Sequence, residues 1–254
     1  MPTPLRSALN VVRDRMFLTG TVRSVEHLTP TMRHVTIEGR QLVGLDHTPG
    51  RQVRVHVNDL FTPSTWTRLG DALRTYSVWA YDRPAGRLEL AVFDHGGDSP
   101  GTVWARGLTA GAQVTFGKPE GDLVAREDAA FHVFAAEETG AVACAAMLAG
   151  LPVNSRVHGV FEAATPDDQV PMAREDDLVR VHRHGSSAAD SALLVKAVAD
   201  LDLPTGPDHG GVAYLPGEAR TIQAIRRHLV AELGWNRRSV LTKPFWTPGK
   251  RGME

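Results

Sequence analysis

The chain has 254 residues, of which 42% are hydrophobic and 22% are charged, and its net charge is close to −1. This length and composition fit two domains of ordinary size, or one large one, with real hydrophobic cores. A charge so close to neutral gives no reason to expect nucleic acid or an anionic membrane as a partner. The lone cysteine, Cys144, excludes an internal disulfide and is typical of a reducing compartment.

No targeting or membrane-spanning segment is expected. Residues 1–17 lack the apolar stretch of a signal peptide. The longest apolar run, around residues 141–151, is too short to cross a bilayer. We therefore expect a cytoplasmic protein without membrane insertion.

The first half of the chain has the pattern of β structure. In residues 52–57 the valines at 53, 55 and 57 share one face of a strand, and Arg54 and His56 share the other. A turn at residues 82–86 separates two further strands and predicts a hairpin. The predicted strands are 17–28, 32–38, 52–57, 73–81, 87–93 and 112–116. Short strands with turns between them, interrupted by one helix, predict a small antiparallel barrel.

The second half alternates strands and helices, which favours a largely parallel sheet. Its clearest helix begins near Gly217, because apolar residues recur at helical spacing until Gly234, which is placed to end the helix. The other predicted elements are strands 131–135, 156–162, 178–182 and 211–215 and helices 138–149 and 187–199. We therefore predict an N-terminal antiparallel β-barrel domain, residues 1–125, followed by a smaller α/β domain with a mostly parallel sheet, residues 126–254.

The most informative segments are Arg74-Thr75-Tyr76-Ser77 and the glycine-rich stretch that starts at His95. Side chains alternate along a strand, so Arg74 and Tyr76 are expected on one face. A guanidinium can bind phosphate oxygens through two hydrogen bonds, and a tyrosine ring can lie against an isoalloxazine. The backbone amides between Gly96 and Thr102 precede a predicted helix, and such amides bind diphosphates. Together these parts suit a flavin and its diphosphate, although each motif alone also occurs in ordinary strands and turns.

With these motifs in this order, and with Gly217-Glu218-Ala219 and Phe245-Trp246 further on, the chain resembles the siderophore-interacting protein family. That family is a branch of the ferredoxin-reductase-like flavoproteins, and the resemblance covers about residues 19–249. It implies an FAD-binding barrel and an α/β domain for NAD(P)H. The cofactor-binding residues that it implies are Arg74, Thr75, Tyr76, Ser77, His95, Gly96, Pro100, Gly101, Thr102, Trp104, Thr139, Gly217, Glu218 and Trp246.

The chain departs from the family pattern at several of these motifs. Trp79 stands where the strand motif ends in arginine, and Ser99 replaces a glycine of the second motif. In the segment implied to face the nucleotide, Ala136 replaces a glycine and Val142 a proline. Whether the altered segment 136–142 still supports nucleotide reduction stays open at this point. Trp246 also has an alternative interpretation, as plain core packing.

The resemblance implies a ferric siderophore as substrate, with cations to bind it. The substrate-binding candidates are Arg51, Arg54, His56 and Lys118, and the alternative is that the arginines are solvated on the barrel exterior. Glu120 stands where the family often has arginine, which argues against a strongly anionic siderophore. No protein metal site is expected, because a siderophore supplies the ligands of its iron.

The resulting hypothesis is an FAD-dependent oxidoreductase that passes electrons from NAD(P)H through flavin to Fe(III) and so releases iron. No catalytic acid or base is expected, because electron transfer requires binding and positioning. A ferredoxin is an alternative donor. The alternative functions are a flavin reductase with another acceptor or redox partner, and a flavin- or siderophore-binding protein without NAD(P)H activity.

Overall fold

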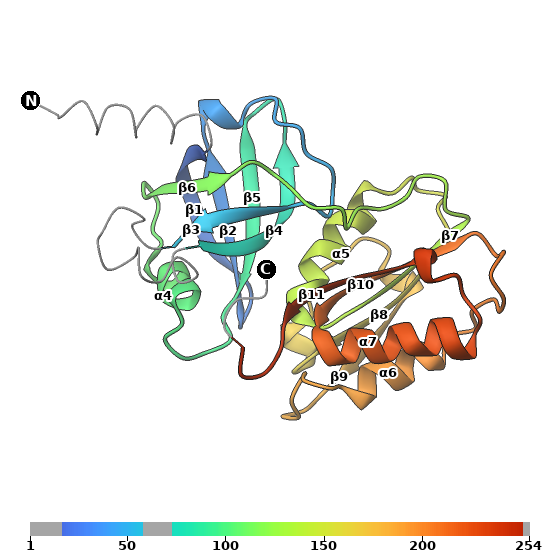
Figure 1. Cartoon of the computed structure of the whole chain (residues 1–254). Coiled ribbons are helices and arrows are strands. Elements are labelled where there is room, and N and C mark those ends of the chain that lie inside the picture. The colour runs from blue at the N-terminus through green and yellow to red at the C-terminus, as the bar shows by residue number, and fades with distance from the viewer. Residues whose placement is uncertain (1–16, 58–72, 251–254) are drawn as a thin grey trace, which may run out of the picture. The chain divides into compact units, whose positions relative to one another are not determined.

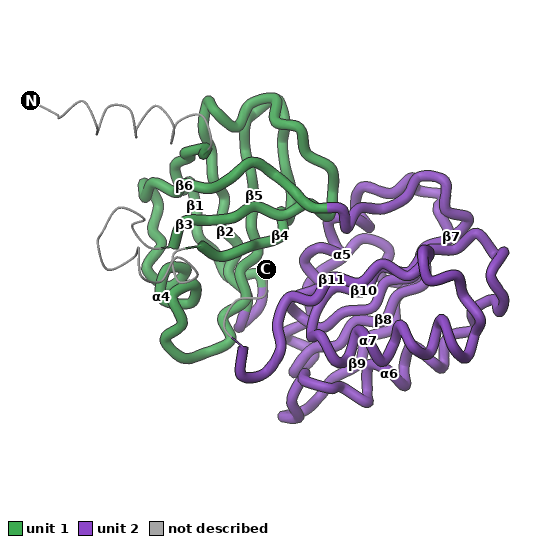
Figure 2. Tube along the Cα trace, viewed as in Figure 1, with its two compact units in different colours: residues 1–28, 32–121 green, residues 29–31, 122–254 purple. Residues whose placement is uncertain are grey.

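The computed structural model describes residues 17–57 and 73–250, so the expectation for the segment before Phe17 lies outside the described residues. The chain divides into two compact units (Figure 2). Unit 1 comprises the residues up to Leu28 together with Met32–Gly121, and unit 2 comprises Thr29–Thr31 and the residues from Asp122 onwards. Unit 2 contains more residues than unit 1.

Unit 1 contains a closed antiparallel barrel, as the alternation of its strands predicts (Figure 1). Its strands follow the order β1-β2-β5-β4-β3-β6, and β6 closes the barrel because it pairs with β1 and, through Phe116 and Val55, with β3. Their bounds are β1 Phe17–Thr29, β2 Met32–Glu38, β3 Gln52–His56, β4 Leu73–Asp82, β5 Arg87–Phe93 and β6 Gln113–Gly117. A short 3-10 helix, η1, spans Arg40–Leu42.

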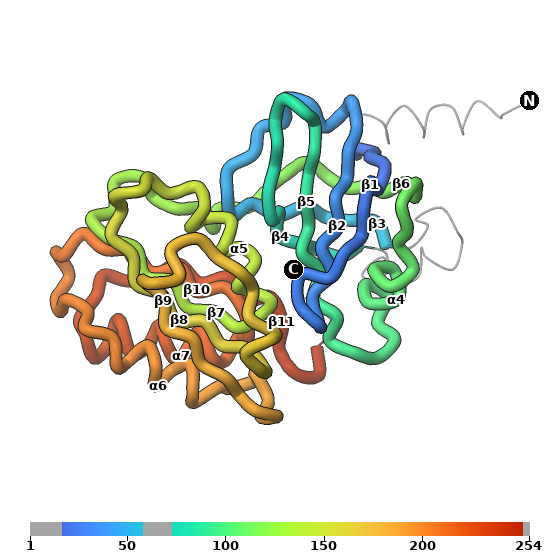
Figure 3. Tube along the Cα trace, turned by 180° about the vertical axis from the view of Figure 1, so that it is seen from behind, coloured from blue at the N-terminus to red at the C-terminus, as the bar shows by residue number. Residues whose placement is uncertain are grey.

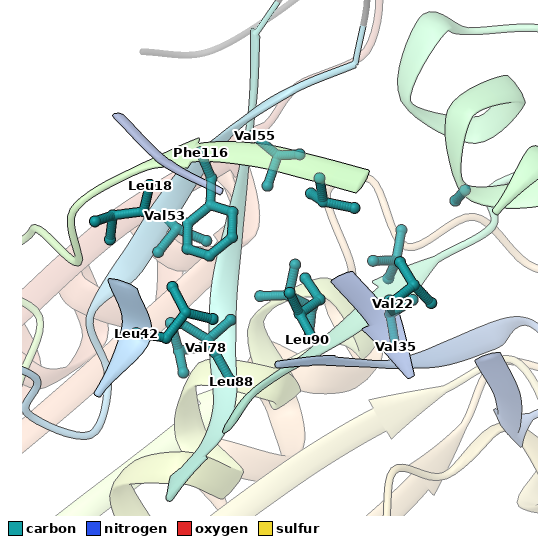
Figure 4. Close-up of a cluster of buried hydrophobic side chains, with 14 of the residues drawn as sticks. Leu18, Val22, Val35, Leu42, Val53, Val55, Val78, Leu88, Leu90 and Phe116 are labelled. Atoms are coloured by element: carbon teal, nitrogen blue, oxygen red, sulfur yellow. The ribbon is translucent and has the colours of Figure 1, made fainter. Parts of the chain in front are cut away.

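The interior of the barrel is filled by aliphatic side chains around Phe116 (Figure 4). Val53 and Val55 of β3 are fully buried there, which confirms the alternation read from residues 52–57. Burying each such side chain contributes roughly 1.5–3 kcal/mol to the free energy of unfolding. The helix predicted in this half is α4, Pro100–Gly107, which lies between β5 and β6 in the chain (Figure 3).

Unit 2 contains a wholly parallel sheet of order β11-β10-β7-β8-β9. Helix α5 lies on one face of this sheet, and α6 and α7 lie side by side on the other (Figures 1 and 3). The strands are β7 Phe131–Ala136, β8 Val157–Ala163, β9 Leu178–His182, β10 Gly211–Glu218 and β11 Val240–Trp246. The helices are α5 Glu138–Gly150, α6 Ala192–Ala199 and α7 Ala219–Arg227, with short turns η2 Pro166–Asp168, η3 Glu175–Asp177 and η5 Arg237–Ser239. The predicted fold class, a barrel followed by an α/β sheet, is confirmed.

Some boundaries in unit 2 differ from the prediction by several residues. Helix α6 begins at Ala192 rather than near Ser187, because Asp190 has a positive φ and Ser191 caps the helix. Strand β10 continues to Glu218, and after α7 the chain continues as a π-helical turn, η4 His228–Glu232. Strand β11 was not predicted. It lies at the edge of the sheet, where Pro244, which has no backbone N–H, removes no hydrogen bond between central strands.

Among the helices within the described ranges, none is long and apolar enough to cross a membrane.

Close contact between α5 and β10 fixes the position of this helix in unit 2. A Cβ atom on Gly140 would lie 2.2 Å from the Pro216 carbonyl oxygen and 2.9 Å from the Cβ of Ala136. Because the obstructing atoms are mostly backbone, only glycine fits at this position.

We therefore expect Gly140→Ala to lower the free energy of unfolding by about 1–3 kcal/mol, as overpacking does. Urea unfolding followed by circular dichroism measures this. Gly107→Ala is the matched control, because nothing lies within 4 Å of its Cβ position, and there we expect a change within about 1 kcal/mol. Equal stabilities of the two variants would contradict the packing argument.

Candidate functional site

The strand motif of β4 lies directly against the start of α4. A Cβ on Gly101 would lie 2.7 Å from the Tyr76 hydroxyl and 3.3 Å from Cγ of Arg74. Arg74 and Tyr76, which were predicted to share one face of the strand, therefore both lie against Gly101 of the helix. Arg74 also donates a hydrogen bond to the carbonyl oxygen of Leu73.

The ring of Tyr76 is stacked on the indole of Trp104 from the next turn of α4. Their centroids are 5.5 Å apart and their planes differ by 21°. Burial raises the pKa of the Tyr76 phenol, with the charge of Arg74 acting in the opposite direction, so the hydroxyl remains protonated and can donate. Trp104 therefore holds one face of Tyr76, and offset stacking of this kind restrains the ring.

The two remaining residues of the strand motif point elsewhere. Thr75 is exposed and pairs with Arg54 of β3, whereas Ser77 is buried and pairs with Gln52. The register between β3 and β4 thereby joins the predicted cofactor residues to the predicted substrate residues on neighbouring strands.

The start of α4 is held by a network of short polar side chains. Ser99 is the N-cap and Pro100 occupies the first turn, where its missing N–H costs nothing. The Ser99 hydroxyl accepts a 3.4 Å bond from the Thr102 amide and donates a 3.0 Å bond to the Thr102 hydroxyl. His95 Nε2 lies 3.2 Å from the Ser99 hydroxyl and 3.3 Å from that of Thr102. Thr102 is only 2% exposed, so its hydroxyl is engaged in holding the turn.

The glycine-rich turn before α4 presents exposed backbone. Gly96 and Gly97 both have positive φ, of 77° and 69°, a conformation that favours glycine. Among the described residues, no heavy atom lies within 4 Å of a Cβ built on either glycine, so their backbone faces open space. Backbone exposed in this way beside the start of a helix is the arrangement that receives phosphate groups.

The four candidate substrate-binding residues occupy the β3 side of the same barrel. Arg54 Nε donates a 2.7 Å bond to Glu120, and Arg51 donates a 3.0 Å bond to Asp46. His56 packs its ring against Phe17 at a centroid distance of 4.4 Å, and burial lowers its pKa. Lys118 is exposed just after β6.

Glu120 is fixed beside Arg54 by the backbone as well as by charge. Its amide and carbonyl exchange two hydrogen bonds with Gln52, of 2.8 and 2.9 Å. This isolated bridge continues the pairing with β3 beyond the end of β6, so the backbone of Glu120 is held beside the strand that carries Arg54. Both side chains remain about half exposed, and such a pair contributes only modestly to stability.

In unit 2, the predicted nucleotide residues surround a carboxylate that sequence reasoning missed. Strands β7 and β10 are neighbours at the point where the order of the sheet reverses, and ligands of open α/β sheets bind beyond the carboxyl ends of such strands. Glu137 lies at this point, 2% exposed, and accepts bonds from the amide and hydroxyl of Thr139. It also accepts a 3.0 Å bond from the indole Nε1 of Trp246 and lies over Gly217, whose Cβ would be 2.9 Å from Oε1.

Glu218 serves as a buried cap of helix α7. Burial alone would raise its pKa, but hydrogen bonds from the amides of Asp190, Arg220 and Thr221 outweigh this, and the pKa is lowered. The Thr221 hydroxyl bonds to the same carboxylate at 2.9 Å. Its acceptor capacity is thus largely used within unit 2.

A second buried network stands at the ends of β8 and β9. Arg183 binds both oxygens of Glu138, at 2.6 and 2.9 Å, and reaches Glu162 at 3.2 Å. Burial raises the pKa of Glu162, with the Ser191 hydroxyl and Arg183 opposing that effect. Within the described parts of the chain, no cluster of three or more His, Cys, Asp or Glu side chains is arranged to hold a metal ion.

Sequence reasoning missed Glu137, Arg183 and the ion pair between Asp94 and Arg106. The pair forms two 2.8 Å bonds, from Nε to Oδ2 and from Nη2 to Oδ1. For Glu137, its position directly after a buried strand was the available signal. The carboxylate partners of Arg183 are distant in sequence, and Asp94 and Arg106 lie on opposite sides of the glycine turn, so no helix or strand spacing indicates either pair.

Comparison with known proteins assigns both units to one family. Residues 21–123 match the model of the siderophore-interacting FAD-binding domain, and residues 129–249 match that of the siderophore-interacting protein. Between them these two models of one family span most of the chain. The chain therefore belongs to the siderophore-interacting protein family, and it is a flavoprotein whose cofactor is FAD.

Individual relatives are distant. The chain is 22% identical over 240 residues to the ferric vibriobactin reductase ViuB of Vibrio cholerae, covering 89% of this chain and 87% of that protein. A siderophore utilization protein from T. fusca matches the fold with a TM-score of 0.78 at 23% identity, over 94% of this chain and 95% of that one. The ferredoxin reductase of carbazole 1,9a-dioxygenase gives a TM-score of 0.69 at 20% identity, over 91% and 69%. These two structural matches confirm the fold.

The buried position of Glu137 has a consequence for stability at different pH values. Burial raises its pKa in the folded state, with the bonds from Thr139 and Trp246 opposing that effect. Ionisation therefore costs more in the folded chain, so the contribution of this group to stability falls as pH rises above its ordinary value of 4.5.

As the pH rises from about 5 to about 8, we expect the wild type to lose stability relative to Glu137→Gln. Glutamine does not titrate, so the subtraction isolates this one group. Urea unfolding of both proteins at matched pH values provides the measurement. A difference that is constant with pH would show that Glu137 titrates normally.

Proposed function

We propose that this flavoprotein is an FAD-dependent reductase of ferric siderophores, which takes electrons from NAD(P)H and releases iron in the cytoplasm. The observation that carries the proposal is the contact of Gly101, in the first turn of α4, with Tyr76, which is stacked on Trp104. This contact lies just after the glycine turn, in a barrel that matches the FAD-binding domain of the family. The distant relationship to ferric vibriobactin reductase supports the choice of reaction.

The chemistry requires a converter between paired and single electrons. Bound FAD accepts a hydride as two electrons and can release them one at a time. One NAD(P)H therefore reduces two Fe(III) siderophore complexes to Fe(II) and leaves NAD(P)⁺ and one proton. The hard oxygen ligands of siderophores favour Fe(III), so reduction loosens the complex and frees the metal.

In this proposal, the residues of unit 1 bind and orient. Tyr76, held from behind by Trp104, offers its ring and its protonated hydroxyl to the flavin. The exposed backbone at Gly96 and Gly97 receives the diphosphate. No side chain needs to transfer a proton, because iron takes up an electron only, and we assign no catalytic residue.

We assign the donor site to the reversal point of the sheet in unit 2. Thr139, Gly217 and Trp246 surround Glu137 there, with Glu218 capping the adjoining helix. This position supports a pyridine nucleotide as donor, since ligands of such sheets bind beyond the strand ends at the reversal. A ferredoxin remains the alternative donor that the experiment below distinguishes.

The substrate face that we assign to Arg51, Arg54, His56 and Lys118 is largely charge-compensated. Asp46 and Glu120 each offset one of the two arginines. This pairing favours ferric complexes with little negative charge, such as hydroxamates, over the strongly anionic catecholates. It equally favours the second candidate function, reduction of an uncharged acceptor other than a siderophore.

Anaerobic spectroscopy tests the proposed reaction. We expect the purified protein to show the oxidised flavin absorption band, to lose it with NADH or NADPH, and to regain it when ferric siderophore is added. Reduction by dithionite but by neither nucleotide, followed by reoxidation, would replace NAD(P)H with another donor. A reduced flavin that no ferric siderophore reoxidises would contradict the substrate assignment.

Removing the charge of Glu120 tests the substrate face. In Glu120→Gln the Arg54 guanidinium keeps its position but loses its carboxylate, so affinity for a tris-catecholate ferric complex should rise about two- to fivefold at low salt. A neutral ferric trishydroxamate should bind almost unchanged. Fluorescence titration gives both dissociation constants.

Glu38→Gln is the matched control, because Glu38 pairs with Arg87 and Arg23 elsewhere in the barrel. The assignment of Arg54 to the binding site would be contradicted if affinity rose equally for both ferric complexes, or equally in Glu120→Gln and Glu38→Gln.

A further inference from the structure

An ion pair ties the glycine turn to the far end of α4. Arg106, in the last turn of the helix, forms the two 2.8 Å bonds to the carboxylate of Asp94. The same guanidinium donates a third bond, of 3.0 Å, to the carbonyl oxygen of Gly97. Asp94 in turn accepts a 3.1 Å bond from the Gly96 amide. The pair therefore contacts the glycine turn at two successive residues.

These two contacts fix the orientation of two peptide groups. A trans peptide directs its carbonyl and its N–H to opposite sides. Because the Gly97 carbonyl is turned toward Arg106, the Asp98 N–H of the same peptide group is turned away from it. In the same way, the bond from Gly96 N–H to Asp94 turns the His95 carbonyl away from the carboxylate. The Asp98 N–H therefore points to the side of the turn opposite the ion pair, where it can donate a hydrogen bond to a ligand.

Side-chain packing does not provide this orientation. Neither glycine has a side chain, and among the described residues nothing lies within 4 Å of their Cβ positions. Both residues have positive φ, and glycine has more backbone freedom than any other residue type, so their own conformational preference does not hold this segment in place. Within the described parts of the chain, the ion pair and the Ser99 network at the start of α4 hold this turn, and of these two the ion pair contacts the glycines directly.

The charge of Arg106 matters as well as its hydrogen bonds. The carboxylate of Asp94 lies within hydrogen-bond distance of the turn, and its hydrogen bonds to Arg106 lower its pKa and keep it ionised. Left unpaired, this charge would repel a phosphate that approaches the turn. Because the Arg106 guanidinium binds both oxygens of this carboxylate, the negative charge is offset, and the carboxylate still orients the Gly96 amide.

We propose that Asp94 and Arg106 are positioning residues for the diphosphate of FAD. Through their bonds to the backbone of Gly96 and Gly97 they would hold the turn His95–Ser99 in the conformation that receives the phosphates. The inference rests on the placement of FAD at this turn in the proposed function. It adds a determinant that distinguishes FAD from flavins without a diphosphate.

Binding of three flavins to the full-length apoprotein tests this inference. In Arg106→Ala we expect the dissociation constant of FAD to rise about tenfold, in line with the loss of charge-assisted hydrogen bonds. Riboflavin carries no phosphate, so its dissociation constant should change less than about twofold, and FMN should fall between. Quenching of flavin fluorescence measures all three constants.

Further variants separate positioning from general stability. Arg106→Lys keeps the charge but loses the fork, so we expect a partial loss of FAD affinity and a normal melting temperature. Asp94→Ala combined with Arg106→Ala should bind FAD no more weakly than Arg106→Ala alone, because the unpaired carboxylate is then absent. Arg87→Ala is the control, since Arg87 pairs with Glu38 at the same 40% exposure but between β2 and β5.

Two results would overturn the proposal. An equal loss of affinity for FAD and riboflavin would mean that the pair supports the barrel or the ring site in general. Unchanged FAD binding in both Arg106 variants would mean that the turn holds its conformation without the pair. Failure of ferric siderophores to reoxidise the flavin would leave the inference standing, because flavin binding is measured without that reaction.

Discussion

The close approach of Gly101 to Tyr76 and Arg74 is the constraint on which the arrangement of unit 1 depends. A Cβ atom at this position would lie 2.7 Å from the Tyr76 hydroxyl, so any larger residue would require the tyrosine or the helix to shift. That contact puts Trp104 one turn further along, where its indole stacks on Tyr76. It also places the capped start of the helix, with its preceding glycine turn, beside the strand motif. The stacked aromatic pair and the exposed glycine backbone, which we propose as the ring and phosphate sites, are thus positioned by one packing contact.

Unit 2 depends on a different device, a buried carboxylate at the reversal point of its sheet. Glu137 accepts bonds from the start of α5 and from the end of β11, and it covers the backbone of Gly217 in β10. Ala136, which replaces a glycine of the family pattern, lies against Gly140 of α5, because a Cβ on Gly140 would be 2.9 Å from the Cβ of Ala136. The altered segment 136–142 is therefore adapted to a tight contact between α5 and β10.

Much of this fold could be predicted from local pattern, because alternation and helical spacing report which side of an element is buried. The barrel strands and the helices α4, α5 and α7 were predicted in this way. Strand β11 was missed because its residues are half-buried and include Lys243 and Pro244, which an edge strand tolerates. The start of α6 was misplaced because the positive φ of Asp190 reflects its bond to Glu218 across the sheet. The candidate site was predicted as a set of residues, but the ion pairs around it were not. Arg54 and Glu120 are distant in sequence, and Asp94 and Arg106 are brought together only by the turn between β5 and α4.

Those pairs also bear on how the protein handles anions. Arg51, Arg54 and Arg106 each have a carboxylate partner, so their charges are offset where they stand. An arginine that is already paired attracts a distant anion weakly, because the field of the pair falls off faster than that of a single charge. What remains specific is short-range: oriented amides, a restrained ring and the shape of the turn. In the proposed site, a diphosphate would be recognised through backbone whose direction is fixed by the ion pair between Asp94 and Arg106, and this mode of recognition requires no excess of positive charge in a chain whose net charge is close to zero.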